Sequence, residues 1–522
     1  MRDLVLGPLL LAFAMTNALS RPSAAQDSTV VATDAGTVRG VRTDDVIAFK
    51  GIPYARPPVG ALRWRPPQPV HPWSGALEAT RFRSDCIQPR RAGLPAFSLE
   101  DCLYINVWHP AAAAEGPRPV MVWIHGGGLV RGGASIYPLE SLAREGIVAV
   151  SFNYRLGRFG FFAHPALATE SPDAARGNYG YMDQIAALEW VRRNIAAFGG
   201  DPDNVTIAGE SAGGGSVLVL LTSPMARGLF HRAILQSPGI PSPRAAAGPM
   251  RELGAAERIA VDYARMLGIK GTDSAALAQL RRVSATTLND GTGDYVSAIF
   301  GGREIPGLSH SIIDGRLVVE PPEVALRAGR HAMVPVLVGA NDADLAVTPA
   351  HTKDALFAQF GASAPWARAV YDPAGDGMQR TLAQSIAADR NVLEPVRYLA
   401  EAMSRAGQPA YYYRFSYVAK GARSTVHGAT QGSEIAYAFD AVPAVFGGTA
   451  TADDLAMART MSGYWAAFAR AGDPNGGGRL WWPPFDPYSG TVLHFTNGGV
   501  VVCPDPARAR LDLWRAVWEG LR

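Results

Sequence analysis

The spacing of hydrophobic residues changes repeatedly between residues 100 and 240. Short runs rich in β-branched residues predict strands at 103–108, 120–124, 147–152, 205–208 and 233–235. Apolar positions near helical spacing predict helices between residues 181 and 195 and from 211 to 221. Strands that alternate with helices predict an α/β fold with a parallel or mixed sheet covered on both faces.

The remaining pattern adds to this sheet rather than starting a second unit. Residues 245–330 are rich in helical and loop signals, and we expect them to lie outside the sheet. Strands are expected again at 336–338 and 411–417, and an amphipathic helix at 455–470. Because no internal repeat and no linker divides the chain, we expect residues 26–522 to form a single domain.

The first residues read as an export signal. Arg2 precedes an apolar run of about 15 residues, which is too short for a confident membrane span, and Ala25 ends a run of small residues. We expect a signal peptide over residues 1–25 and a periplasmic or secreted protein, with no later stretch apolar enough to anchor it. The three cysteines fit that oxidising compartment, although three reduced, buried thiols are the alternative.

Composition limits the classes of function. Of the 522 residues, 48% are hydrophobic, which is enough for a large core. The net charge is only +3 and no long basic run occurs, so we expect no nucleic-acid partner. The cysteine spacings match no zinc motif, and no phosphate-binding glycine pattern is present, so we expect neither a metal nor an organic cofactor.

Two glycine-rich motifs carry candidate chemistry. Gly209–Gly213 has the form G-x-S-x-G, in which Ser211 would stand on a tight turn between a strand and a helix. His125 is followed by Gly126, Gly127 and Gly128 directly after a predicted strand. Such a run lets backbone N–H groups point at a developing oxyanion, which is typical of esterases.

With these motifs the sequence resembles the type-B carboxylesterases, the carboxylesterase/cholinesterase branch of the α/β-hydrolases, and within them a bacterial-type secreted member. The matching stretches are FKGIPYARPPVGALRWRPPQP (49–69), EDCLYINVW (100–108), WIHGGG (123–128), FNYRLGRFGF (152–161), GNYGYMDQIAALEWVRRNIAAFGGDPDNVTIAGESAGG (177–214) and RAILQSPG (232–239). The resemblance implies a central mixed, mostly parallel sheet flanked by helices, with large helical and loop insertions that form a gorge.

The resemblance also implies roles for single residues. Ser211 would be the nucleophile, and the backbone N–H groups of Gly127, Gly128 and Ala212 would form the oxyanion hole. Ser237 and Glu210 would lie beside the catalytic triad. Cys86 and Cys102 would form the family's first disulfide, which leaves Cys503 over.

The acidic member of the triad is less regular. The family carries a glutamate a few residues after a strand that ends in glycine, and Asp344 holds that position here. Asp342 is a near rival, because it lies only two residues earlier. Aspartate can orient a histidine as glutamate does, and the order serine, aspartate, histidine suits this fold.

The histidine departs from the family. The family motif reads roughly H-G-x-E-I-x-F-V-F, and residues 431–439 lie in the same register, so that Gln431 takes the place of the histidine. Glutamine cannot act as a general base. His427 lies four residues earlier, and we expect it to be the base, since His351 and His494 stand in less comparable surroundings.

The sequence therefore predicts an exported serine carboxylic-ester hydrolase that acts on a small-molecule ester through an acyl-enzyme on Ser211. The alternative is a catalytically impaired or non-catalytic binding protein on the same fold, because Gln431 replaces the histidine. Ala92 stands where cholinesterases carry their choline-binding tryptophan, so choline esters are not expected substrates.

Overall fold

The computed structural model describes residues 29–89, 98–170, 175–238, 250–291, 305–308, 310–344, 352–426 and 428–520. The expected signal peptide, Ala92 and His427 lie outside these residues. The helices are α1 (Glu140–Arg144), α2 (Gly157–Gly160), α3 (Tyr179–Asn194), α4 (Ala212–Thr222), α5 (Leu253–Met266), α6 (Ser274–Arg282), α7 (Ala285–Asn289), α9 (Pro322–Arg327), α10 (Lys353–Ala358), α11 (Ala364–Tyr371), α12 (Gln379–Ala388), α13 (Glu394–Arg405), α14 (Ile435–Ala438), α15 (Val442–Phe446), α16 (Ala452–Ala471) and α17 (Arg508–Gly520).

Eleven strands of the described chain form one large sheet, in the order β18-β17-β16-β15-β12-β11-β9-β10-β8-β4-β3. These strands are β3 (Val41–Thr43), β4 (Val46–Pro53), β8 (Tyr104–Pro110), β9 (Arg118–Ile124), β10 (Val148–Phe152), β11 (Gly200–Glu210), β12 (Arg232–Gln236), β15 (Val336–Asn341), β16 (Ala410–Phe415), β17 (Thr491–Thr496) and β18 (Gly499–Pro504). Smaller sheets contain β1 (Val30–Ala32), β2 (Thr37–Arg39) and β5 (Ala76–Glu78), β6 (Asp85–Cys86) and β7 (Ser98–Leu99), and β13 (Arg251–Glu252) and β14 (Ile312–Ile313).

The direction of the strands sets where a site can form. All neighbours from β10 across to β17 are parallel, whereas β18, β8, β4 and β3 add antiparallel pairs at the two sides. The carboxyl ends of β9, β11, β12, β15 and β16 therefore meet at one edge of the sheet. In open α/β sheets this is the edge where active sites form. The mixed, mostly parallel sheet predicted from the sequence is confirmed.

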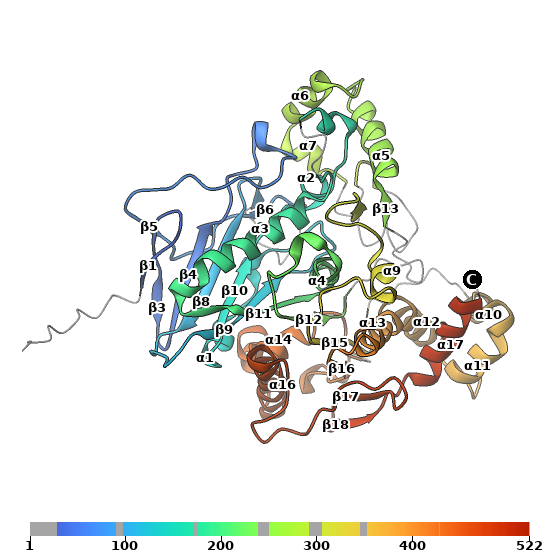
Figure 1. Cartoon of the computed structure of the whole chain (residues 1–522). Coiled ribbons are helices and arrows are strands. Elements are labelled where there is room, and N and C mark those ends of the chain that lie inside the picture. The colour runs from blue at the N-terminus through green and yellow to red at the C-terminus, as the bar shows by residue number, and fades with distance from the viewer. Residues whose placement is uncertain are drawn as a thin grey trace, which may run out of the picture.

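The two faces of the sheet are buried under different helices (Figure 1). In β9, Val120, Val122 and Ile124 pack into the core that contains α3, α4 and α13. The alternate residues Met121 and Trp123 pack into the core that contains α1 and α16. This alternation follows from the period of two residues in a strand, and it explains why the central strands read as continuous apolar runs.

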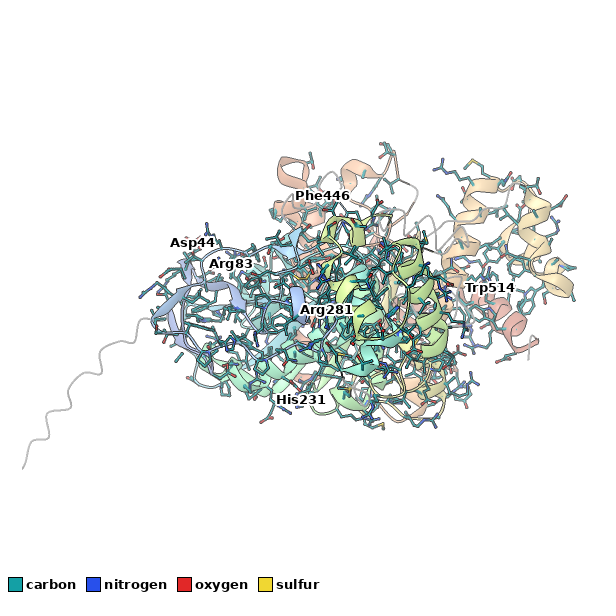
Figure 2. The ribbon with its side chains drawn as sticks, turned by 90° about the horizontal axis from the view of Figure 1, so that it is seen from above. Asp44, Arg83, His231, Arg281, Phe446 and Trp514 are labelled. Atoms are coloured by element: carbon teal, nitrogen blue, oxygen red, sulfur yellow. A yellow bond between two sulfur atoms is a disulfide. The ribbon has the colours of Figure 1, made fainter. Side chains whose placement is uncertain are left out.

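Peripheral helices extend the molecule beyond the sheet. Helices α5, α6 and α7 belong to the middle segment, which the sequence predicts to lie outside the sheet. They lie together at the top of the view in Figure 1. Helices α10, α11, α12 and α17 enclose a separate small core, which includes Phe360 and Trp514. Seen from above, Asp44 and Trp514 lie toward opposite ends of the described molecule (Figure 2). Among the described helices, none combines the length and the apolar character needed to cross a membrane.

A disulfide closes the loop before β8. Cys86 and Cys102 are bonded, with their Cα atoms 4.8 Å apart, and both residues are buried. Within this loop the side-chain amide of Gln88 donates to the carbonyl of Gly132 at 2.7 Å and accepts from the N–H of Gly132 at 2.9 Å. Through Gln88, the disulfide therefore also fixes the backbone at Gly132, which follows the glycine run at 126–128.

Replacing both Cys86 and Cys102 with serine should lower the melting temperature, because the unfolded chain then regains the freedom of a loop of about 17 residues, worth roughly 3 kcal/mol. Thermal unfolding measures the change. The matched control is Cys503→Ser, which removes the free, half-buried cysteine and should leave the melting temperature close to that of the parent. An unchanged melting temperature in the double variant would contradict this role for the bridge.

Glu170 joins two segments that are far apart in the sequence. Its carboxylate accepts hydrogen bonds from Arg65 at 2.9 and 3.0 Å and from Arg281 at 2.6 and 2.8 Å; Arg281, on α6, is labelled in Figure 2. These hydrogen bonds, first from Arg281 and then from Arg65, lower the pKa of Glu170 to about 2, against the opposing effect of its burial. The group thus fastens α6 to the loop that carries Arg65.

Glu170→Gln should reduce the free energy of unfolding at pH 7 by about 1 kcal/mol, since the carboxylate is partly exposed and its ion pairs are screened. A lowered pKa stabilises the folded state above the ordinary pKa of a glutamate, and this contribution disappears as the pH falls toward 2. The difference between variant and parent in urea unfolding should therefore shrink below about pH 4.5. Glu115→Gln, at an exposed position, serves as the control, and a difference that is constant down to pH 3 would contradict the assignment.

Candidate active site

Ser211 lies in the turn between β11 and α4. Its backbone has φ 56° and ψ −125°, a strained conformation for a residue with a side chain. The turn is held because the N–H of Ser211 donates to the carbonyl of Gln236 at 2.9 Å, while the carbonyl of Ser211 accepts from the N–H of Gly215 at 2.8 Å. The result is a half-buried serine at the amino end of a helix, on the edge where the parallel strands end.

The glycines of the motif are needed because the backbones approach closely. A Cβ atom on Gly209 would lie 2.5 Å from the carbonyl carbon of Gly213, and one on Gly213 would lie 2.0 Å from the carbonyl oxygen of Ile124. Neither backbone can move without shifting β9 or α4. The predicted G-x-S-x-G turn is thus a consequence of how tightly α4 packs between β11 and β9.

The glycine run after β9 faces this turn. A Cβ atom on Gly126 would lie 2.7 Å from the carbonyl oxygen of Glu210 and 3.1 Å from Cβ of Ser211. Gly127 and Gly128 have φ of 106° and 69°, which glycine adopts without strain. The loop therefore passes directly beside Ser211 and the start of α4.

His125 packs as part of the core. It is buried and stacks on Tyr154 with ring centroids 4.3 Å apart, while its carbonyl accepts the Tyr154 hydroxyl at 2.7 Å. Burial lowers the pKa of His125 to about 4, against a hydrogen bond to the carbonyl of Gly126. His125 is thus a neutral, buried imidazole, and its contacts with Tyr154 hold the start of the glycine run in place.

The hydroxyl of Ser211 has an amide as its neighbour. Nε2 of Gln431 donates to Oγ of Ser211 at 2.7 Å. In a serine hydrolase this is the place of the nitrogen that accepts the serine proton. The structure therefore agrees with the sequence register, which puts Gln431 at the family's histidine position. His427, which we expected to be the base, lies outside the described residues.

The segment before Gln431 is bound to the end of β15. The N–H of Ala429 donates to Oδ1 of Asp342 at 2.7 Å, and the N–H of Ala343 donates to the carbonyl of Ala429 at 3.0 Å. Nδ2 of Asn341 donates to the carbonyl of Thr430 at 2.7 Å. The last residue of β15 and the two residues after it thus hold Ala429 and Thr430, which fixes the position of the backbone directly before Gln431.

Three buried carboxyl groups lie behind the serine. They belong to Glu210, Glu434 and Asp344, and all three side chains are buried. Burial raises the pKa of Glu210 well above its ordinary value, and the charges of Glu434 and Asp344 raise it further, against a hydrogen bond from Gln431. Burial also raises the pKa of Glu434. Close carboxyl groups repel each other's negative charge, so burial and this repulsion together favour the protonated form of Glu210.

Hydrogen bonds from side-chain amides offset part of the free energy that burial of these carboxyl groups costs. Glu434 accepts from Nδ2 of Asn341 at 2.6 Å and from Nε2 of Gln236 at 3.2 Å, and Oε1 of Gln236 accepts from Trp465 at 3.0 Å. The sequence motifs assign no role to Asn341, Gln236 or Trp465. For Asn341 a signal existed, because it stands at the end of β15 immediately before both candidate acids.

The structure separates the two candidate acids. Asp344 is fully buried, its Oδ2 accepts from the N–H of Asn341 at 3.3 Å, and it lies near enough to Glu210 to influence its pKa. Asp342 is only partly buried and binds the N–H of Ala429 instead. Ser237, at the end of β12, is buried with φ 42°, and its N–H donates to the carbonyl of Gly339 at 2.8 Å. Its hydroxyl has no hydrogen-bond partner among the described residues.

A large mixed sheet with a serine at the strand-to-helix turn after β11 defines an α/β-hydrolase. The carboxylesterase family model matches residues 27–514, so the chain belongs to the carboxylesterase family. It is 38% identical to fumonisin B1 esterase of Sphingopyxis macrogoltabida, over 94% of this chain and 92% of that protein. It is 36% identical to carboxylesterase 1E of Mus musculus, over 86% of this chain and 85% of that protein.

A solved structure agrees with this assignment. PNB esterase superposes with a TM-score of 0.78 at 31% sequence identity, over 93% of this chain and 100% of its own. The resemblance stated from the sequence motifs is confirmed, and the relatives identify the chain as a carboxylic ester hydrolase.

Gly213→Ala should destabilise the protein by at least about 1–3 kcal/mol, because the added methyl overlaps the carbonyl of Ile124. Urea unfolding and the yield of folded protein measure this. Gly421→Ala is the matched control, since a Cβ atom there meets nothing within 4 Å. If both variants unfold at the same urea concentration as the parent, the close packing of α4 against β9 is not a constraint.

Proposed function

We propose that this protein is an exported carboxylic ester hydrolase that works through an acyl-enzyme on Ser211. The observation that carries the proposal is the conformation of Ser211, with φ 56° and ψ −125° between β11 and α4, beside the glycine run at 126–128. A backbone strained in this way persists only where the surrounding structure enforces it, and such strain is concentrated at functional sites. The proposed protein is one domain, residues 26–522, that follows a signal peptide of residues 1–25.

The proposed chemistry is acyl transfer in two steps. Oγ of Ser211 bonds to the ester carbonyl carbon, and the N–H groups of Gly127, Gly128 and Ala212 stabilise the oxyanion that forms. The alcohol then leaves with the proton that the serine lost, and the acyl group stays on Oγ. Water attacks this acyl-enzyme, returns a proton to Oγ and releases the carboxylic acid.

A proton acceptor is required in both steps, and we propose His427 for this role with Asp344 as its acidic partner. Support comes from the residues that follow His427 in the chain. A Cβ atom on Gly428 would lie 2.9 Å from both Oδ1 of Asp342 and Cβ of Ala343. The chain next to His427 thus lies against the loop that carries Asp344.

A second candidate function is favoured by the contact between Gln431 and Ser211. A side-chain amide accepts no proton at neutral pH, and here it donates to the very oxygen that must be deprotonated. If His427 stays away from Ser211, the protein would bind esters and react with them slowly or not at all. This is the catalytically impaired or non-catalytic alternative on the same fold.

The substrate is proposed only as a class, a small-molecule carboxylic ester. One relative is named for fumonisin B1, so that compound belongs in the first hydrolysis screen beside simple aryl and alkyl esters.

Variants at three positions decide between the two functions. His427→Ala should lower kcat by about a thousandfold or more if His427 is the base, as removal of a triad member does. Ser211→Ala should abolish both hydrolysis and labelling by a fluorophosphonate, and it serves as the control. The measurements are steady-state hydrolysis of an aryl ester and mass spectrometry of the labelled protein.

Two results would count against the proposal. An active parent that is indifferent to His427→Ala would end the assignment of the base. An inactive parent that becomes active through Gln431→His would establish the second candidate. A histidine at position 431 would then accept the proton of Ser211, which a glutamine cannot do.

A further inference from the structure

A buried glutamine holds a piece of backbone that lies against the glycine run. The side chain of Gln88, in the loop between Cys86 and Cys102, is buried. Its Nε2 donates to the carbonyl of Gly132 at 2.7 Å and to that of Cys86 at 3.0 Å, while its Oε1 accepts from the N–H of Gly132 at 2.9 Å. Both amide hydrogens and the amide oxygen are thus engaged, and Gly132 is held at both of its backbone polar groups.

Gly132 in turn packs on the first peptide of the glycine run. It has a φ of 104°, and a Cβ atom there would lie 2.5 Å from the carbonyl oxygen of Gly126 and 2.6 Å from Nδ1 of His125. The contact therefore leaves no room for a side chain at position 132. The position of Gly132 limits where the carbonyl of Gly126 can lie.

The carbonyl of Gly126 is also held by the side chain of His125. Nδ1 of His125 lies 2.9 Å from this oxygen, and because a carbonyl oxygen only accepts, Nδ1 carries the proton and donates it. Burial lowers the pKa of His125 to about 4, so the imidazole is neutral at pH 7 and this N–H is its only one. In agreement, Nε2 of His125 makes no hydrogen bond within the described part of the chain.

The direction of this carbonyl sets the direction of a proposed oxyanion donor. The peptide between Gly126 and Gly127 is trans, and in a trans peptide the C=O and N–H bonds point to opposite sides. A Gly126 carbonyl that is fixed toward His125 and Gly132 therefore fixes the N–H of Gly127 away from them.

The second peptide of the run is held by backbone groups of its own loop. The carbonyl of Gly127 accepts from the N–H groups of Val130 at 3.3 Å and Arg131 at 3.1 Å, which fixes the direction of the N–H of Gly128 in the same way. The first peptide differs because part of its support comes from Gln88, 44 residues before Gly132.

We propose that Gln88 is a positioning residue for ester hydrolysis, which acts through Gly132 to keep the N–H of Gly127 directed at the oxyanion. Its amide is fully used by backbone groups, so Gln88 acts through Gly132 rather than on the substrate. The inference rests on the proposed function of Ser211. It gives the loop closed by the disulfide a part in the reaction besides its part in stability.

The variant Gln88→Met tests the proposal, because methionine keeps the length of the side chain and removes the amide. The direction of an oxyanion donor matters most in the transition state, where the negative charge forms. For an aryl ester, kcat should fall about tenfold while KM changes by less than about twofold. The inhibition constant of a trifluoromethyl ketone, which forms a tetrahedral adduct on serine, should rise about tenfold as well. All values are referred to the concentration of folded protein.

Two control variants separate positioning from stability. Ser135→Ala removes a hydrogen bond from the same segment, since Oγ of Ser135 donates to Asp85 at 2.8 Å. Gln68→Met removes an amide that, like that of Gln88, donates to the carbonyl two residues earlier, at 2.9 Å. In both controls kcat should stay within about twofold of the parent, whatever the melting temperature. Controls that lose as much kcat as Gln88→Met, or a Gln88→Met protein with the kcat and inhibition constant of the parent, would overturn the proposal.

Hydrogen exchange tests the same support without activity. The amides of Val130 and Arg131 donate to Gly127 rather than to Gln88. They should nevertheless exchange at least about tenfold faster in Gln88→Met, because the loop that they close loses its support. Unchanged exchange would overturn the role of Gln88. A parent that neither hydrolyses esters nor reacts with a fluorophosphonate at Ser211 would overturn the proposed function, and the exchange rates would still decide whether Gln88 holds the glycine run.

Discussion

The close approach of the first turn of α4 to the end of β9 is the constraint on which the site depends. A single carbon added at Gly213 would lie 2.0 Å from the carbonyl of Ile124, so the helix has one possible place. That place forces Ser211 into its strained backbone and brings the glycine run of 126–128 against the same turn. Packing in the two cores on either side of the sheet holds β9 and β11 together, and thus maintains the strain.

The surroundings of Ser211 separate two parts of ester hydrolysis that usually occur together. In the proposed mechanism the turn and the glycine run would stabilise negative charge, which depends only on backbone N–H groups. Acceptance of the serine proton depends on one side chain, and at its usual place stands Gln431. Behind it lie the buried carboxyl groups of Glu210, Glu434 and Asp344, whose burial costs desolvation free energy.

How much of the fold and of the candidate site could be predicted from the sequence depends on how far apart in the chain the contacting residues lie. The turn at Ser211 and the glycine run are local motifs, so their conformation follows from a few neighbouring residues. The family resemblance supplied the disulfide between Cys86 and Cys102, and the structure contains it. The presence of Gln431 at the family's histidine position could also be predicted, because residues 431–439 match the family motif without a gap.

Long-range contacts were beyond such reasoning. Asp342 and Asp344 are two residues apart after a strand, and no periodicity distinguishes them; only the position of Ala429, 87 residues later, does so. The hydrogen bond between Oγ of Ser416, directly after β16, and Nε2 of His494 on β17 has no sequence motif either, since it depends on β16 and β17 being neighbours in the sheet. Sequence patterns identify groups that must react, whereas groups that hold a loop in place become visible only when the strands that carry them are aligned.

The two functions considered for this chain differ by a single proton acceptor. Enzymes of this mechanism that lose a triad member keep about 10³–10⁴-fold catalysis over water from the oxyanion hole and substrate binding. A site with Ser211 and the glycine run intact would therefore still react with esters, although slowly. Because deacylation needs the base as much as acylation does, loss of the base prolongs the acyl-enzyme rather than simply preventing it. The lifetime of the acyl group on Ser211 is thus the physical quantity that separates a turning-over esterase from a protein that captures esters.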